Sequence, residues 1–333
     1  MNKYPILICT NKNEKTTDIV LEYIDYLGGK FYRVHKDDMI KDISINIDSN
    51  IKDDYIELKF KNKNNYTTYI KNMWYRRGDF SKILPISKFE LNSNRIRKEC
   101  ILKEWDITKT FLHYHLPTLG NYNSEVKSNK IKDLVIARDC SLDIPETLVT
   151  TEKSKLIEFY KRNSSIITKP IDNGHLSYKD KINTYSSKGI VFIDDKLIEK
   201  LEIRFCLSLF QKYEEKEFEI RVFFIKKKLY PMAIFSQRDI KTRFDFRNYN
   251  RENPNRNVPF KFPKRIEKKI LNFIHLSNLD TGSIDLIYTP DNRFVFLEVN
   301  PAGQFGWVSQ NCNYYLEKEI AKLLIEQNLK NHG

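Results

Sequence analysis

Two carboxylates and one side-chain amide near the C-terminal end of the chain have the residue types and spacing of a cation-binding site. Asp285, Glu298 and Asn300 lie in two runs of β-branched and aromatic residues on either side of the turn-forming pair Asp291-Asn292. This pattern predicts a β-hairpin. Continuing its ladder from that turn places Asp285 opposite Glu298, and the alternation of side chains along a strand places Asn300 on the same face as Glu298.

In this register Thr289 pairs with Phe294, and the opposed carboxylates have Cβ atoms about 4.5–5.5 Å apart. Like charges at that separation repel unless a cation lies between them. Carboxylate and amide oxygens are hard ligands that suit Mg²⁺. The alternative is a solvated acidic strand face, and the hairpin alone does not decide between the two.

Two lysines upstream of the hairpin have positions suited to phosphate groups. Lys169 ends the apolar strand pattern Ile166-Ile167 and precedes Pro170, so its ammonium can extend from a strand end. In the alternative interpretation, Lys169 is a surface lysine whose ammonium reaches the solvent. Lys130 lies on an expected helix, where lysines are usually solvated, so it is weaker evidence for phosphate binding. The sequence has no Walker A loop and no GxGxxG motif. A bound nucleotide would therefore need separate lysines.

The segment Phe210-Gln-Lys-Tyr213 is expected to link two sheet-like domains. The backbone groups of an unpaired segment suit the edge of an adenine base, and the Tyr213 ring could pack on it. The alternative is an ordinary strand end. Gln211 and Lys212 are the other side chains at this position.

Arginine occurs in two alternating patterns that suit anions. Glu219 and Arg221 share one face of a strand, where they could form an intrasheet ion pair of little energetic value at a surface. Arg243, Asp245 and Arg247 share a face if their segment is extended. That row is either a salt-bridged strand or an anion site, because the planar guanidinium matches carboxylate and phosphate.

Helix and strand patterns alternate along the whole chain, which predicts an α/β or α+β fold. A strand over 6–9 precedes a helix capped by Thr16 or Thr17 and ended by Gly28-Gly29. The further expected elements are a boundary loop at 117–123, helices over 124–137, 152–162 and 264–276, strands over 165–170, 205–212 and 218–225, and a long loop over 248–263.

The composition of the 333 residues is that of a globular chain, with 41% hydrophobic and 30% charged residues. No run approaches the roughly 20 apolar residues of a membrane span, so we expect no membrane partner. The five cysteines are scattered without a CxxC pair, which favours the cytoplasm. The net charge of +13 has three possible explanations. The protein could bind nucleic acid, it could bind an anionic small molecule or an acidic peptide as substrate, or its composition could simply be biased toward Lys, Asn and Ile. No nucleic-acid motif or basic stripe accompanies it, so we expect no nucleic-acid partner.

In their order along the chain these motifs resemble the ATP-grasp ligases. The segments Trp74-Tyr-Arg-Arg77, Leu209–Tyr213, Glu219–Val222, Phe235-Ser-Gln237 and Glu298–Trp307 narrow the resemblance to the peptide maturases of graspetides. These are the microviridin-type ligases, including the grasp-with-spasm branch. The resemblance implies an N-terminal α/β domain over 1–120 and two α+β subdomains over 121–208 and 209–333 that hold ATP between them.

The resemblance also implies an activity, in which ATP drives closure of side-chain ester or amide rings in a ribosomal precursor peptide. It implies ATP and Mg²⁺ as cofactors, an acidic precursor peptide as partner and, in our expectation, a homodimer. The implied residue roles are phosphate contacts from Lys130 and Lys169, adenine and ribose contacts from Gln211, Lys212 and Tyr213, metal binding by Asp285, Glu298 and Asn300, and γ-phosphate and carboxylate contacts from Arg221 and Arg247, with Arg243 and Asp245 beside them. The family usually has a glutamate where Lys212 stands, and Glu219 is its expected substitute.

Three rival interpretations remain from the sequence. One is a ligase that adds free amino acids to a carboxylate terminus. The others are a non-catalytic nucleotide- or peptide-binding module and a nucleic-acid binder.

Overall fold

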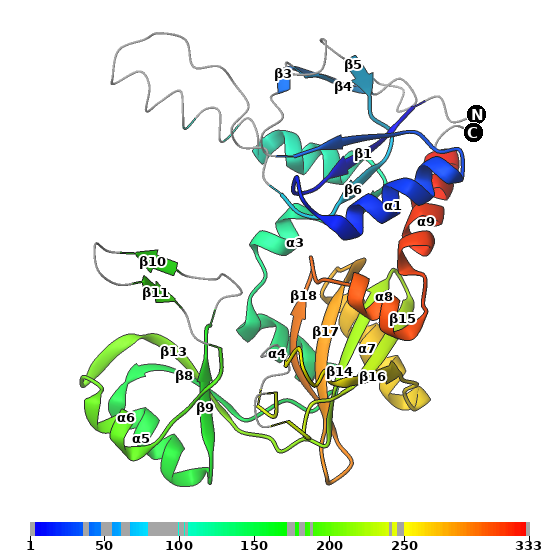
Figure 1. The fold of residues 1–333 in the computed structure, drawn as a ribbon. Coiled ribbons are helices and arrows are strands. Elements are labelled where there is room, and N and C mark those ends of the chain that lie inside the picture. The colour runs from blue at the N-terminus through cyan, green and yellow to red at the C-terminus, as the bar shows by residue number, and fades with distance from the viewer. Residues whose placement is uncertain are drawn as a thin grey trace. The chain divides into compact units, whose positions relative to one another are not determined.

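The computed structural model divides into two compact units, residues 1–126 with 304–333 and residues 127–303. Each unit combines β-sheets with α-helices (Figure 1), which confirms the predicted mixed α/β class. The division into three domains stays a prediction. The structure describes residues 4–35, 40–47, 55–60, 67–78, 99, 103, 106–171, 177–179, 184–186, 189–239, 242–244 and 250–330.

A parallel sheet forms the centre of the first unit, with the strand order β2-β1-β6-β7. Its strands are β1 (Ile6–Cys9), β2 (Phe31–Val34), β6 (Met73–Tyr75) and β7 (Thr118–Leu119). Helix α1 (Lys15–Tyr26) connects β1 to β2, and α9 (Leu316–Lys330) packs beside it. The cap of α1 is Glu14, whose carboxylate accepts from Thr17 N at 2.8 Å. The expected cap at Thr16 or Thr17 is therefore wrong.

The first unit also contains a second sheet and further helices. An antiparallel sheet contains β3 (Ile40–Asn46), β4 (Tyr55–Phe60) and β5 (Thr67–Tyr69). Residues 106–115 are helical, and α3 (Tyr122–Val126) and α8 (Gly306–Cys312) are short helices.

Arg76, in the motif Trp74-Tyr-Arg-Arg77, is an internal anchor of the first unit. Its side chain is buried, with Nη2 3.4 Å from Glu14 and 3.1 Å from Gln304. Its guanidinium also lies 5.2 Å from the centroid of the Phe305 ring. Burial lowers the pKa of Arg76 to about 10. This arginine ties the end of β6 to the cap of α1 and to the chain that leads into α8.

The first sheet of the second unit is antiparallel, with the order β12-β9-β13-β8. One face packs on two helices, where Leu156, Phe159 and Ile198 contact Ile166 and Phe210. The elements are β8 (Thr147–Glu152), α5 (Lys153–Arg162), β9 (Ile166–Lys169), β12 (Val191–Phe192), α6 (Asp195–Lys200) and β13 (Arg204–Lys212), with a separate hairpin of β10 (Ser177–Lys179) and β11 (Thr184–Ser186).

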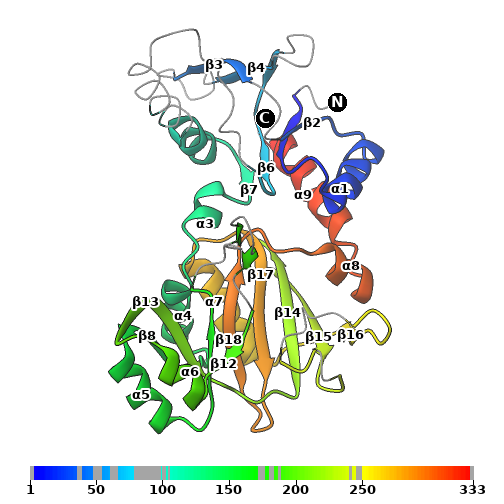
Figure 2. The same ribbon diagram turned by 60° about the vertical axis from the view of Figure 1, so that its left-hand side comes forward.

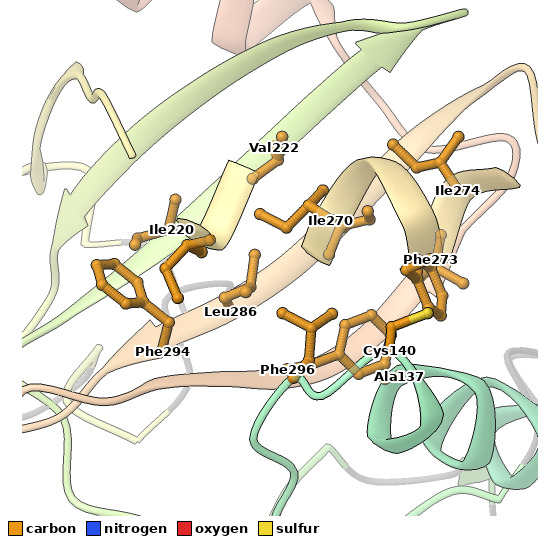
Figure 3. Packing of buried hydrophobic residues seen from close by; sticks show 14 of the residues in the cluster. Ala137, Cys140, Ile220, Val222, Ile270, Phe273, Ile274, Leu286, Phe294 and Phe296 are labelled. Atoms are coloured by element: carbon orange, nitrogen blue, oxygen red, sulfur yellow. The ribbon is translucent and has the colours of Figure 1, made fainter. Parts of the chain in front are cut away.

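The second sheet of this unit is also antiparallel, with the order β16-β15-β14-β17-β18 (Figure 2). Helices α7 and α4 cover one face, where Ile270 and Phe273 pack against Leu286 and Phe296 (Figure 3). The elements are α4 (Lys130–Asp139), β14 (Phe218–Ile225), β15 (Lys228–Phe235), β16 (Arg256–Pro259), α7 (Lys264–Leu276), β17 (Thr281–Tyr288) and β18 (Phe294–Asn300).

Two expectations about these elements are wrong. The single helix expected over 124–137 is two helices, because Asn129 caps α4 by accepting from Ile131 N and Lys132 N. The long loop expected over 248–263 contains β16, which pairs with β15. The first difference matters for the site, because it makes Lys130 the first residue of a helix.

Candidate functional site

Asp285 and Glu298 are paired across the β17–β18 hairpin, as predicted from the sequence. The path to that pairing differs from the expected one, since Tyr288 rather than Thr289 pairs with Phe294. A register shift between Asp285 and Leu286 then compensates for the longer turn. The two offsets cancel, so the carboxylates lie opposite one another.

The polar face of the β14–β18 sheet gathers the side chains predicted to bind the cation. Arg221 pairs with Asp285, and Ser283 pairs with Asn300, so these residues alternate with the apolar ones that face α7. The apolar set is Ile220, Val222, Ile284, Leu286 and Val299, all part of the core. The packing of α7 therefore fixes which face the carboxylates occupy.

Each of the two carboxylates has a cationic partner. Arg221 Nη1 lies 2.7 and 2.8 Å from the two carboxylate oxygens of Asp285. Lys130 Nζ lies 3.3 Å from Glu298 and donates to the Pro170 carbonyl oxygen at 2.9 Å. Only 8% of the Lys130 side chain is exposed. The start of α4 is thus joined to both the hairpin and the end of β9.

Lys169 is the last residue of β9 and directly precedes Pro170. It pairs with Leu209, on the face of its sheet opposite Ile166 and Phe210, which pack on the helices. Because Lys130 contacts the Pro170 carbonyl group, the structure brings together the chain segments of both predicted phosphate-binding lysines.

The predicted adenine segment is partly paired within the protein. Lys212 N donates to Glu146 O at 2.9 Å, and Tyr213 N donates to Ser165 O at 3.0 Å. The expectation of an unpaired backbone is therefore wrong for these two amides. The Gln211 side chain, 1% exposed, donates to Thr147 Oγ1 at 2.9 Å.

Comparisons with known structures identify the fold. The chain matches a Chryseobacterium gregarium RiPP-associated ATP-grasp ligase in complex with ADP and a leader and core peptide, with a TM-score of 0.80 and 22% identity over 97% of each chain. It matches the Microcystis aeruginosa macrocyclase MdnC bound with precursor peptide MdnA at TM-score 0.73 and 22% identity, covering 97% and 99% of the two chains. The ATP-grasp ligase PsnB, complexed with minimal precursor, Mg and ADP, gives a TM-score of 0.68 and 15% identity over 97% of each chain.

The chain has the ATP-grasp fold. Compared by sequence, it matches neither a protein-family model nor a curated protein. The ATP-grasp fold that the sequence resemblance implies is therefore confirmed by three-dimensional structure. None of the helices that the structure describes is long and apolar enough to cross a membrane.

The predicted metal-binding residues of this chain include the donor types that Mg²⁺ prefers. Two carboxylates and the Asn300 amide lie on one sheet face, and cationic side chains already compensate both carboxylates. The described residues hold no cluster of three or more His, Cys, Asp or Glu side chains suited to a metal. Arg221 Nε is buried and has no hydrogen-bond partner among the described residues, so an anionic oxygen could accept from it. The residues therefore fit a magnesium–phosphate group.

Sequence reasoning did not find the aromatic cluster around Tyr213, the last residue of the predicted adenine segment. The Tyr213 ring centroid lies 5.0 Å from that of Phe192 and 6.1 Å from that of Phe244. Burial, with the nearby Glu215 and Glu219 carboxylates, raises the pKa of Tyr213. Phe192 comes from β12 and carries no motif, so the sequence offered no signal for its position.

Glu219 lies on the same sheet face as Arg221 but is engaged in a different contact. Its Oε1 accepts from Lys216 Nζ at 2.6 Å and from Ser236 Oγ at 2.8 Å. Burial raises the pKa of this carboxyl. The role expected of Glu219 at the ribose stays a prediction.

The Arg-Asp-Arg row is described only at its first member. Arg243 has an exposed side chain, and its backbone N–H donates to Asp239 O at 2.8 Å. Asp245 and Arg247 lie outside the described residues. Whether the three share a face stays a prediction.

Proposed function

We propose that this chain is an ATP-dependent ligase which phosphorylates Asp or Glu side chains of a ribosomal precursor peptide and closes side-chain ester or amide rings. One observation carries the proposal: Asp285 and Glu298 face each other on a hairpin whose carboxylates already contact Arg221 and Lys130. The two carboxylates could bind a metal ion, and the two cationic side chains could bind the phosphates of a triphosphate. The ATP-grasp ligases of similar structure, in complexes with peptides and ADP, support the same reaction class.

The residues divide by the part of the substrate that each would contact. Lys130 and Lys169 would bind the phosphates as compact point charges. Gln211, Lys212 and Tyr213 would line the adenine and ribose, with Glu219 as a further expected ribose contact. Asp285, Glu298 and Asn300 would hold Mg²⁺, which when bound neutralises charge on the phosphates of ATP.

The chemistry follows from the weakness of a carboxylate as an electrophile. Its oxygen attacks the γ-phosphorus of ATP, ADP leaves, and an acyl phosphate with a good leaving group forms. Arg221, Arg243 and Arg247 would bind the carboxylate and stabilise the oxyanion, with Asp245 orienting the guanidiniums. A Ser or Thr hydroxyl or a Lys amine of the same peptide then attacks the carbonyl carbon and expels phosphate. Holding both groups on one chain supplies the proximity that a weak nucleophile needs.

The partner that we propose is an acidic precursor peptide. MdnC and the Chryseobacterium gregarium ligase were each solved with peptide bound. The net charge of +13 favours an acidic chain by long-range attraction. We further propose a cytoplasmic homodimer, the compartment being consistent with free thiols at Cys9, Cys140, Cys206 and Cys312.

The test is to incubate the protein with ATP, Mg²⁺ and the acidic peptide encoded beside it, and to measure both ADP and peptide mass. We expect ADP release that depends on the peptide, together with peptides that have lost water. A peptide that gains the mass of added glutamate would favour the amino-acid ligase. ADP release at the peptide-free rate would favour the non-catalytic module.

A further inference from the structure

The segment that follows β15 is held in place by its own hydrogen bonds. Thr242 Oγ1 donates to Ser236 O at 2.9 Å, and Gln237 Nε2 donates to Arg243 O at 3.0 Å. Thr242 Oγ1 also lies 3.0 Å from Asn255 Oδ1. Residues 236–239 and 242–244, which include Arg243 and which we call the arginine segment, are therefore held to one another by hydrogen bonds.

One buried ion pair fastens both ends of the arginine segment. Glu219 Oε1 accepts from Ser236 Oγ, where the segment begins, and from Lys216 Nζ. The same Lys216 Nζ donates to the carbonyl oxygen of Phe244, where the described part ends, at 3.2 Å. The Lys216 and Glu219 side chains are only 6% and 10% exposed.

The pair also lies beside the predicted adenine segment, Phe210–Tyr213, which we call the nucleotide hinge. Lys216 follows Tyr213 by three residues in the chain, and the ring of Phe244 contacts the rings of Tyr213 and Phe192. The positive charge of Arg243 acts on Tyr213, where it opposes the effect of the neighbouring carboxylates on the pKa. Lys216 thus contacts the backbone of Phe244, the residue after Arg243, and the Phe244 ring contacts Tyr213.

The energetics of the buried Lys216–Glu219 ion pair indicate that it positions the segments it contacts rather than stabilising the fold. A buried lysine–glutamate pair loses the hydration of both charges, and well-packed apolar side chains would often stabilise a fold as well. What the charged pair supplies is a fixed hydrogen-bond geometry, because Glu219 Oε1 has two donors and Lys216 Nζ has two acceptors.

We propose that Glu219 and Lys216 are positioning residues that hold the arginine segment against the nucleotide hinge and thereby set the affinity for the acceptor carboxylate. This inference rests on the proposed function. It does not require Glu219 to touch ATP.

The experiment compares Glu219→Ala, Glu219→Gln and Lys216→Met with wild type in peptide ligation, ATP binding by calorimetry, and hydrogen exchange over 236–244. We expect the KM for peptide to rise about tenfold in Glu219→Ala and Lys216→Met, because a displaced binding group loses its alignment with the substrate. In Lys216→Met, which removes no expected nucleotide contact, the Kd for ATP should stay within about twofold. Hydrogen exchange in the segment should become faster. Glu219→Gln keeps an acceptor oxygen and should be intermediate, and Lys216→Arg should restore much of the peptide affinity.

A control is the ion pair between Lys226, in the turn between β14 and β15, and Asp280, which directly precedes β17. Its charges lie 2.8 Å apart, and its side chains are more exposed, at 41% and 28%. Lys226→Met removes a lysine from an ion pair of the same unit and should alter neither the peptide KM nor exchange over 236–244. A similar change in this control would contradict a specific role for Lys216.

Three results would overturn the proposal. A raised Kd for ATP with unchanged exchange in Glu219→Ala would make Glu219 a direct nucleotide ligand. A lower melting temperature and kcat with unchanged peptide KM would make the pair structural only. If wild type itself ligates no peptide, the proposed function fails separately, and unchanged exchange over 236–244 in Glu219→Ala then overturns the positioning role on its own.

Discussion

Lys130 Nζ lies 3.3 Å from a carboxylate oxygen of Glu298, so a phosphate-binding candidate and a metal-binding candidate neutralise each other within the protein. The contact depends on Asn129, which starts α4 at Lys130. Magnesium-bound ATP would offer an anion to the lysine and a cation to the carboxylate. The pair therefore compensates two charges that would each be costly to bury alone. In the proposed function, each charge would exchange its partner for a group of the bound substrate.

Replacing Glu298 by glutamine should abolish ring closure while leaving the fold intact. The amide keeps the size of the side chain but removes the negative charge that holds the cation and pairs with Lys130. We expect ADP formation to fall at least about a hundredfold, since changing outer partners of a metal site alone costs about 10–100-fold. Glu267→Gln, on an exposed position of α7, is the control. Unaltered turnover of Glu298→Gln would contradict the metal assignment.

Removing the guanidinium from Arg221 should make stability depend on Mg²⁺. Arg221→Met leaves Asp285 without its cross-strand partner, and both side chains are largely buried, at 11% and 16% exposure. We expect a loss of about 2–4 kcal/mol in unfolding free energy, near the range for breaking a buried pair. Added Mg²⁺ should raise the melting temperature of Arg221→Met more than that of wild type. An equal rise in both proteins would show that Asp285 does not bind the cation.

Gly303 should be required for the end of β18 to reach its position. A Cβ atom there would lie 2.4 Å from Ser283 Oγ and 2.5 Å from Ser283 Cβ. Gly303→Ala should therefore destabilise the protein by about 1–3 kcal/mol, as overpacking does. Because Gly303 N bonds to Asn300 O, the apparent affinity for Mg²⁺ should weaken as well. Ser283→Gly should partly restore both in the double variant, and a failure to do so would place the strain elsewhere.

Asp133 should make the protein less stable as the pH rises from about 4 to about 6. Burial on α4 raises the pKa of this carboxyl from 3.8 to about 6. The folded protein therefore holds the proton more tightly than the unfolded chain, and stability falls between the two pKa values and stays constant above them. The difference corresponds to at most about 3 kcal/mol. Denaturant unfolding of Asp133→Asn across this range should lack that slope, and an unchanged slope would contradict the assignment.

The sequence was sufficient to predict the strands that carry the site and the opposition of Asp285 and Glu298. Strand β14 and helix α7 have the expected bounds, because alternating and helical apolar patterns respectively mark them clearly. The pairing of the carboxylates was predicted from a turn that is one residue shorter than the observed turn. The register shift between Asp285 and Leu286 compensates for that difference. Pattern reasoning cannot see such a shift, since no residue type requires it.

Contacts between segments far apart in the chain were beyond the sequence. The Lys216 link to Phe244 spans 28 residues, and the approach of Lys130 to Glu298 depends on how α4 packs against β18. In the sequence, Lys130, Lys216 and Glu298 are charged residues of the kind usually found at the surface. Only the fold shows that these lysines are buried and paired.

The most direct test of the central claim follows the carboxylate oxygen during ring closure. The precursor peptide would be prepared with heavy oxygen in its Asp and Glu carboxylates and incubated with the protein, ATP and Mg²⁺. If the chain makes an acyl phosphate, the phosphate released should carry one heavy oxygen for each ring closed. Ring closure that releases only unlabelled phosphate would contradict activation of the peptide's carboxylates by ATP.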